Sequence, residues 1–517
     1  MMGSLNDSVV NSEFIEPTFL KIEKMYSFII SIIALVLGFV IYGRVVERVF
    51  GADAKRITPA YTMNDGVDYM PMPTWKVFLI QFLNIAGTGP VFGAIQGILF
   101  GPAAYFWIVL GCIFGGAMHD YMAGAISLRK NGASLPEIIG DELGQTARIA
   151  MRTLSLLLMV LVGAVFTTTP AGLLANMTSG WGFFGTSLFW SIVIIVYYAL
   201  ATLLPINKII GRIYPIFGAI LLFMAIAIFF GIFRHDGFMP EVTDAFVNHH
   251  PTSVMPIFPG ICVTIACGAV SGFHATQSPL MARCLKNEKL ARPVFYGSMI
   301  TEGFVALIWA AASIKFASSL GADGATPYEQ LWNVLTDNGA HGANPAILVN
   351  KICHSWLGSF GAILAVLGVV FAPITSGDTS FRCARLIASD FFQVRQDKML
   401  NRILISLPIF ACSIFLMLVD FQVLWRYFAW FNQTLSLFTF WAVTVWLVKQ
   451  KKCYWMSLIP GLWMTMACAT YIFVAPEGFH LAQPVANALG GAFTLLLLTV
   501  FICWYRRYQK NSVKCKV

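Results

Sequence analysis

The sequence predicts an all-α polytopic membrane protein with about 13 transmembrane helices. Of its 517 residues, 58% are hydrophobic and only 11% are charged, and the mean hydropathy is +0.73. Polar side chains are therefore too few to cover a water-soluble surface of this size. A helix needs about 20 apolar residues to cross the hydrocarbon. Runs close to that length cover residues 26–43, 76–99, 101–127, 153–175, 182–204, 213–233, 256–279, 292–316, 355–380, 403–420, 423–449, 454–475 and 485–505.

The distribution of positive charge tests this number of spans. Of the 34 Lys and Arg residues, 28 fall in alternate connections and the C-terminal tail, whereas 6 fall in the N-terminus and the other connections. Cytoplasmic loops carry the excess of Lys and Arg, and a wrong count would scramble the alternation. The pattern predicts thirteen spans, with the N-terminus outside and the C-terminus in the cytoplasm.

The first run, 26–43, is predicted to remain as an extra N-terminal helix, because no small-residue cleavage site follows it before Arg44. The second run contains NIAGTGPVFGAIQG, from Asn84 to Gly97. Pro90 lacks an N–H group and two nearby glycines weaken the helix, so we expect a break about halfway across. The freed backbone groups must be buried in protein or line a wet cavity. A simple proline kink is the alternative.

The run 256–279 carries a second interruption, at Gly268, Ser271, Gly272 and His274. Counted from the run 76–99, it is the sixth helix of a core, and the two interrupted helices enter from opposite sides. Such a pair is typical of inverted-repeat transporters that bind substrate at the midplane. We expect an N-terminal tail, helix and loop, two five-helix repeats, and two further helices with a basic tail, in the ranges 1–75, 76–233, 234–449 and 450–517.

Both interruptions supply candidate substrate contacts. The half-helix that begins at Pro90 would aim its N-terminal N–H groups at the central cavity, which favours an anionic group such as a carboxylate. We expect Gly89 to lie where backbone and substrate approach closely. For His274, a hydrogen-bonded core histidine is the alternative. The predicted substrate-binding residues are Asn84, Gly87, Thr88, Gly89, Gln96, Ser271, His274 and Gln277.

Charged residues inside apolar runs are candidates for ion coupling, since each is costly in the bilayer. Glu302 lies about ten residues into its run, near midplane depth. Burial favours the protonated form of a carboxyl, which suits a proton carrier, although a carboxyl that hydrogen-bonds two helices together is the alternative. His119 and Asp120 could relay protons or form a structural pair.

A hydroxyl-rich segment, Thr375 to Thr379, lies in the run 355–380. Thr375, Ser376 and Thr379 offer the hard oxygen ligands of a small cation such as Na⁺, or they hydrogen-bond their own helix or a neighbour. Asp378 is included with this ion-coupling group. It stands four residues from Arg382, so we expect the two to pair with each other near the inner end.

Other function classes are disfavoured. Eight histidines without H-E-x-x-H argue against a membrane enzyme, and the eleven cysteines show no C-x-x-C pair. We expect no cofactor other than a coupling ion, H⁺ or Na⁺. The net charge of +9 lies in the loops and does not indicate a nucleic-acid partner. The expected partners are a small-molecule substrate and the lipid bilayer; the sequence does not predict an oligomeric state.

Three ordered segments resemble the carbon starvation protein A (CstA) family of bacterial inner-membrane transporters: the one from Asn84 to Ser134, SGFHATQSPLMARCL and ITSGDTSFRCARLI. The resemblance implies a LeuT-like five-plus-five core, an inner-membrane location, and uptake of peptides or pyruvate under carbon starvation, with protons as the driving ion for pyruvate. A sodium-coupled carrier of amino acids or carboxylates, and a nutrient-sensing membrane protein of transporter fold, are the alternatives.

Overall fold

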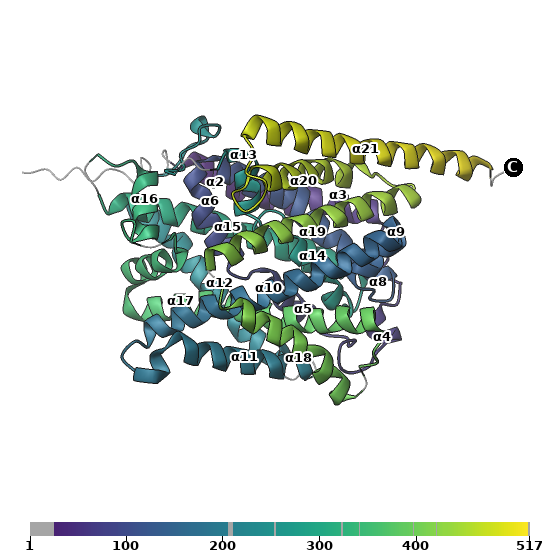
Figure 1. The fold of residues 1–517 in the computed structure, drawn as a ribbon, viewed down its shortest axis with the longest axis horizontal. Helices are drawn as coiled ribbons and strands as arrows, with labels where there is room; N and C mark the ends of the chain where they lie inside the picture. The colour runs from purple at the N-terminus through teal and green to yellow at the C-terminus, as the bar shows by residue number, and fades with distance from the viewer. Residues whose placement is uncertain are drawn as a thin grey trace, which may run out of the picture.

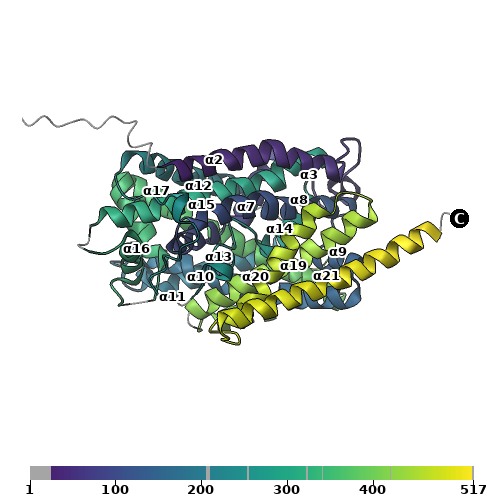
Figure 2. The same cartoon turned by 90° about the horizontal axis from the view of Figure 1, so that it is seen from above.

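The computed structural model describes residues 25–204, 210–252, 255–321, 324–340, 342–396, 398–419 and 421–514. Every regular element in these ranges is helical, which confirms the predicted class. The helices form an elongated bundle, and most of them run along its long direction (Figures 1 and 2). The short helix α4 and the C-terminal end of α21 lie at one end of the bundle, and α16 lies at the other.

The elements of the first half begin with a peripheral helix and continue through the first interrupted span. Segments named η are short 3₁₀ or π turns. Their bounds are α2 Tyr26–Leu37, η1 Gly38–Tyr42, α3 Gly43–Phe50, α4 Pro59–Thr62, α5 Thr74–Ile85, η2 Gly89–Gly93, α6 Ala94–Gly97, η3 Ile98–Phe100, α7 Ala103–Leu110, η4 Gly111–Gly116, α8 Ala117–Arg129, α9 Leu135–Leu143, α10 Gln145–Met177, η5 Gly182–Gly185, α11 Ser187–Leu203 and α12 Ile210–Arg234.

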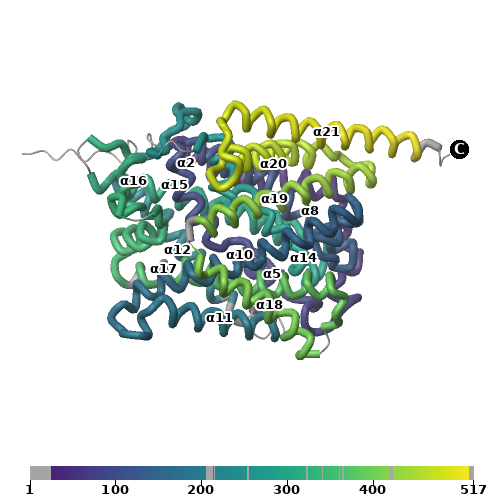
Figure 3. Tube along the Cα trace, in the orientation of Figure 1, coloured from purple at the N-terminus to yellow at the C-terminus, as the bar shows by residue number. Residues whose placement is uncertain are grey.

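The second half contains the other interrupted span and ends with two long helices. Its elements are η6 Val242–Asp244, α13 Ile257–Thr264, α14 Gly272–Ala282, η7 Glu288–Leu290, η8 Arg292–Tyr296, α15 Gly297–Ser319, α16 Pro327–Thr336, α17 Pro345–Phe392, α18 Met399–Leu416, α19 Phe421–Lys449, α20 Trp455–Val474 and α21 Gln483–Lys514. Helices α10 and α17, far apart in sequence, pack along each other and can be followed in Figure 3.

Ten helices of the described chain are long and apolar enough to cross a membrane, and the bent pair α5 with η2–η3 makes eleven. The other two predicted runs correspond to α11, which has 17 residues, and to the broken pair α13 and α14. Their shortness keeps them below the length of a span, so the count of thirteen and the LeuT-like repeat stay predictions. The division into four segments is likewise still a prediction.

Both predicted interruptions are present. Helix α5 ends at Ile85, and the chain turns through non-helical backbone before η2 begins at Gly89, which bends the span by 53°. Between α13 and α14, Gly268 has a φ of +94°, a conformation that glycine adopts without strain. The sequence therefore located both breaks correctly.

The two breaks pack directly against each other through a stripe of glycines. Side chains at Gly89, Gly93 and Gly97 would meet Cys267, the carbonyl of Thr264 and the side chain of Ile265. These glycines are spaced four residues apart and so share one face of the half-helix, which allows close helix approach. The face of Gly89 that a side chain would occupy is filled by Cys267, so the glycine is needed for this packing. The predicted approach of its backbone to the substrate stays a prediction.

Accessibility of two loops tests the predicted orientation. The native Cys453 is exposed between α19 and α20, and His480 lies in the loop between α20 and α21. If α20 crosses the membrane with the predicted orientation, a charged, impermeant maleimide should label Cys453 only from the cytoplasmic side, and should label a His480→Cys variant from outside. Labelling of both positions from one side would contradict it. Cys515, in the C-terminal tail that is predicted to be cytoplasmic, would be a second site for labelling from the inside, but it lies outside the described residues.

Candidate substrate and coupling site

The backbone freed by the second break is satisfied by polar side chains of other helices. Gln433 of α19 donates from Nε2 to the carbonyls of Cys262 and Val270, at 3.0 and 2.9 Å. Asn432 accepts at Oδ1 from the Phe273 backbone N–H, at 2.7 Å. These bonds replace the ladder that the break removes, as the bilayer interior requires.

Two further contacts complete this arrangement. The Trp107 indole donates to the Ile265 carbonyl at 3.0 Å, and the Ser271 hydroxyl donates to Asn432 Oδ1 at 3.0 Å. Sequence analysis missed Asn432 and Gln433. The signal for them was two adjacent amides inside the apolar run 423–449, where unpaired polar groups are costly.

The first break is joined to α17 by hydroxyl groups. The Leu83 carbonyl, near the end of α5, accepts from Thr375 Oγ1 at 3.2 Å and from Ser376 Oγ at 3.0 Å. Thr379 donates to carbonyls of its own helix, at 3.1 Å to Thr375. Thr375 and Ser376 also donate to the Ala372 carbonyl of their own helix, at 2.8 and 3.2 Å. All three hydroxyls therefore bond as the alternative describes, to their own helix or to a neighbour, and Thr375 and Ser376 in addition meet the break with oxygen atoms.

Four titratable side chains from three helices form a continuous buried chain. Glu302 of α15 lies 3.4 Å from His274 Nε2 of α14, and His274 Nδ1 lies 3.1 Å from Asp120 of α8. The other carboxylate oxygen of Asp120 is 2.9 Å from His119 Nδ1. All four side chains have no exposed surface. We name this set the His–Asp–Glu chain. Sequence analysis singled out each member, but only the fold brings them together.

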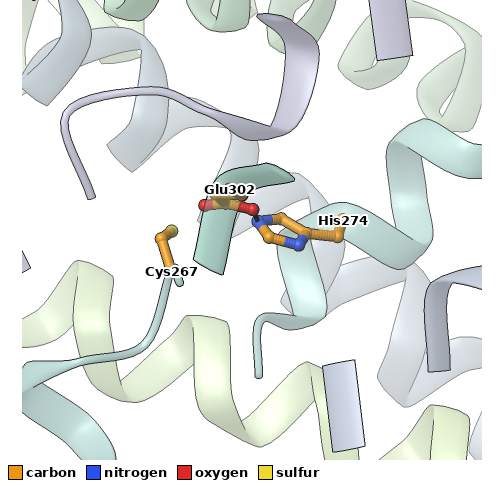
Figure 4. A group of neighbouring side chains, drawn as sticks. All are labelled: Cys267, His274 and Glu302. Carbon is orange, nitrogen blue, oxygen red and sulfur yellow. Dashed lines mark ion pairs between the residues drawn. The ribbon is translucent and has the colours of Figure 1, made fainter. Parts of the chain in front are cut away.

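The Glu302 end of this chain faces the second break. Figure 4 shows the His274 imidazole pointing at the Glu302 carboxylate, with Cys267 beside them. Donor atoms of these three residues lie within 4.8 Å of one another. Neither carboxylate oxygen of Glu302 makes a hydrogen bond to another side chain in the described part of the chain. Its charged neighbour is His274, at 3.4 Å, so the carboxylate retains capacity to bind a proton.

Several predicted substrate contacts are buried and have polar atoms without a partner in the described structure: both amide atoms of Asn84, Thr88 Oγ1 and Gln277 Oε1. Buried polar groups are normally hydrogen-bonded, so these atoms are available to a substrate or to water. Gln96 is half-buried, whereas Ser271 is engaged with Asn432. A side chain at Gly87 would meet Phe166 and Ser376, so Gly87 serves the packing of the break.

The predicted pairing of Asp378 with Arg382 is wrong. Asp378 accepts hydrogen bonds from the Tyr197 and Tyr214 hydroxyls, the first at 2.6 Å. Arg382 instead forms an ion pair with Asp68 at 3.0 Å. The helical spacing rule applies to exposed side chains; both of these are buried, and each takes its partner from the element packed against it.

Through its ion pair with Arg382, Asp68 joins the loop before α5 to the C-terminal part of α17. Arg385 is also within 3.8 Å of its carboxylate, and the Arg283 guanidinium stacks over the ring of the adjacent Tyr69. Burial disfavours the Asp68 carboxylate, but the positive charges around it outweigh burial and hold its pKa below the usual value. This charged cluster joins the loop before α5 to α17, and Arg283, just after α14, stacks on the same loop.

Comparisons with known proteins agree on one family. Residues 23–189, 177–321 and 338–471 match the family described as "Carbon starvation protein CstA". An "Uncharacterized membrane protein" of Haemophilus influenzae is 43% identical over 338 residues, which cover 56% of this chain and 91% of that protein.

Two relatives from Escherichia coli K12 carry functional names. A "Peptide transporter CstA" is 26% identical over 569 residues, covering 87% of this chain and 81% of that protein. A "Pyruvate/proton symporter BtsT" is 28% identical over 331 residues, covering 51% of this chain and 45% of that protein.

Two near-isosteric substitutions test the support of the second break. Asn432→Asp keeps the oxygen that accepts from Phe273, whereas Gln433→Glu replaces a donor to two carbonyls with a group that donates at most once. We expect Gln433→Glu to destabilise the protein by about 1–3 kcal/mol and Asn432→Asp to cost less. Thermal unfolding of the detergent-solubilised protein measures this. Equal effects, or a larger loss for Asn432→Asp, would contradict the assignment.

Proposed function

Since this chain belongs to the carbon starvation protein CstA family, we propose that it is a proton-coupled secondary transporter that imports peptides or small carboxylates such as pyruvate across the bacterial inner membrane during carbon starvation. The comparisons support a transporter. The coupling ion and the substrate class are our proposal, and they rest on the His–Asp–Glu chain and on the two breaks that meet beside it.

The observation that carries proton coupling is the contact between Glu302 and His274, at 3.4 Å. Adding or removing one proton changes the charge of two carboxylates and two imidazoles that have no exposed surface, where electrostatic interactions are strong. Two thiols of the described chain also lie near Glu302: Cys112 of η4 and Cys267. Protonation of the chain therefore alters the interactions of His274 on α14 with Glu302 on α15 and with Asp120 on α8.

This contact links proton binding to movement of the second break. His274 lies in the first turn of α14, two residues after its start at Gly272. A proton shared between His274 and Glu302 makes their contact a charge-assisted hydrogen bond, which strengthens the attachment of α14 to α15. Loss of the proton weakens this attachment. The break supplies the flexible point, so the half-helix can close over a bound substrate in one state and release it in the other.

The substrate class follows from the groups left without partners. Asn84 and Thr88 lie on either side of the first break, and both carry buried polar atoms free to bond. The N–H groups at the start of the following half-helix favour an anion. Pyruvate and the C-terminus of a peptide both present a carboxylate, and the names of the two relatives point to these two classes.

Sodium coupling is the second candidate, and one observation favours it. The Leu83 carbonyl and the hydroxyls of Thr375 and Ser376 converge at the first break. Oxygen donors of this kind suit a small hard cation. The hydroxyls here already donate to the carbonyl, however, and no carboxylate lies among these donors to balance the charge of an ion.

Glu302→Gln separates the two candidates, because it removes the titrating group and keeps the shape and most hydrogen bonding. In proteoliposomes, uptake of labelled pyruvate or a dipeptide driven by a pH gradient should fall at least about tenfold, whereas exchange across the membrane without a gradient should continue. Asp337→Asn is the matched control, since Asp337 is exposed and has a positive φ that Asn readily adopts.

The assay should contain a metal chelator, because the donor atoms of Cys267, His274 and Glu302 lie close enough to bind a stray divalent cation. Accumulation by Glu302→Gln that still follows the pH gradient would exclude Glu302 from coupling. Intact accumulation that requires Na⁺ and is weakened by Ser376→Ala would favour the sodium candidate.

A further inference from the structure

We propose that the protein binds an anionic phospholipid at a site between α3 and the start of α15, away from the transport path. The headgroup would occupy a basic pocket at the end of the bundle that carries α4, and an acyl chain would lie in an apolar groove that continues from it. Neither feature takes part in the proposed coupling mechanism.

The headgroup pocket has a volume of about 310 Å³ and an excess of positive charge. Its lining includes Arg44 and Arg48 on α3, Lys289 in η7 and Arg292 at the start of η8, with Glu47 as the one carboxylate among the lining residues. Glu47 pairs with Arg292 at 2.9 Å, so the remaining basic groups are left to attract an anion. Arg44, Arg48 and Lys289 are exposed.

The groove has a volume of about 590 Å³ and lies between α2, α5 and α15. Its lining is almost wholly apolar, with Val36 and Phe39 on one side, Trp75 and Phe78 on another, and Phe304 farther along α15. Helix α2 faces outward with many exposed apolar side chains, and 28% of its span is buried. A lipid-facing surface of this shape accommodates a hydrocarbon chain.

Arg292 connects the two features. It lines the basic pocket, and its guanidinium lies 5.1 Å from the ring centre of Phe39, which lines the groove. The next residue, Pro293, also lines the groove. A phosphate held in the basic pocket by Arg44, Arg48 or Lys289 would therefore lie next to the groove, and a chain attached to that phosphate would enter it past Arg292.

The depth of the pocket in the membrane also fits a lipid. Trp75 begins the groove with its ring half exposed, and Lys76 lies 5.6 Å from that ring; Trp and Lys at a helix end mark the membrane interface. By the charge pattern this is the cytoplasmic side, where anionic lipids attract basic pockets between helices. A free phosphate ion would bind only in the basic pocket, whereas a phospholipid would fill both the pocket and the apolar groove.

The test uses the full-length protein in a neutral detergent, with native mass spectrometry to measure retention of phosphatidylglycerol and phosphatidylcholine of equal chain length. The wild type should prefer phosphatidylglycerol. Arg44→Gln with Arg48→Gln should weaken its binding about thirtyfold, because two basic groups are lost. Arg506→Gln with Arg507→Gln removes the same charge from exposed positions of α21 and should leave binding unchanged.

A second pair of variants tests the groove. Val36→Trp fills it, whereas Leu37→Trp changes the adjacent exposed residue of α2, which does not line it. Only Val36→Trp should reduce phosphatidylglycerol retention. Equal losses from both charge pairs would show non-specific attraction and overturn the site. So would binding of glycerol 3-phosphate as tight as that of the lipid, with no effect of Val36→Trp, which would indicate a free-anion pocket.

Discussion

The structure depends on one constraint: two apolar helical runs are interrupted inside the bundle, and every backbone group that the breaks release must find a partner within the protein. An unpaired N–H or carbonyl in hydrocarbon costs several kcal/mol. The breaks are therefore stable only because side chains of other helices hydrogen-bond to the freed backbone groups. Asn432 and Gln433 serve the second break, and the hydroxyls of Thr375 and Ser376 serve the first. These hydrogen bonds hold α19 against the second break and α17 against the first.

The same constraint explains why titratable groups collect at this place. The start of a half-helix is attached to the protein by side-chain hydrogen bonds instead of backbone hydrogen bonds to a preceding turn, so it can shift when one of these contacts changes strength. His274 lies in the first turn of such a half-helix. Its partners, Glu302 and Asp120, come from helices on either side. In the proposed mechanism, a proton entering this chain acts on the half-helix α14, whereas the ion pair of Asp68 with Arg382 joins the loop before α5 to α17.

The sequence was sufficient for the helical class, for both breaks and for singling out the four residues that the fold joins in the His–Asp–Glu chain, because proline, glycine and buried charge act locally and leave a local signal. The coupling role of these residues stays a proposal. It was insufficient for partners. The spacing of Asp378 and Arg382 suggested one pair, yet each side chain points to a different neighbouring element. The sequence placed Gly89 in the break correctly, but it did not predict that Gly89 packs against Cys267. Tertiary packing decides which segment contacts each face of a half-helix, and the local sequence does not record it.

We propose that the substrate and a proton at the His–Asp–Glu chain each favour the binding of the other, because linkage between two sites is reciprocal. The measurement is to add pyruvate, or a dipeptide, to the purified wild-type protein in a weakly buffered solution with a pH-sensitive dye, while calorimetry records binding. The account predicts that the protein takes up protons as the substrate binds, in proportion to the sites filled. Binding with no change in pH, and with an affinity that depends on Na⁺ instead, would contradict it.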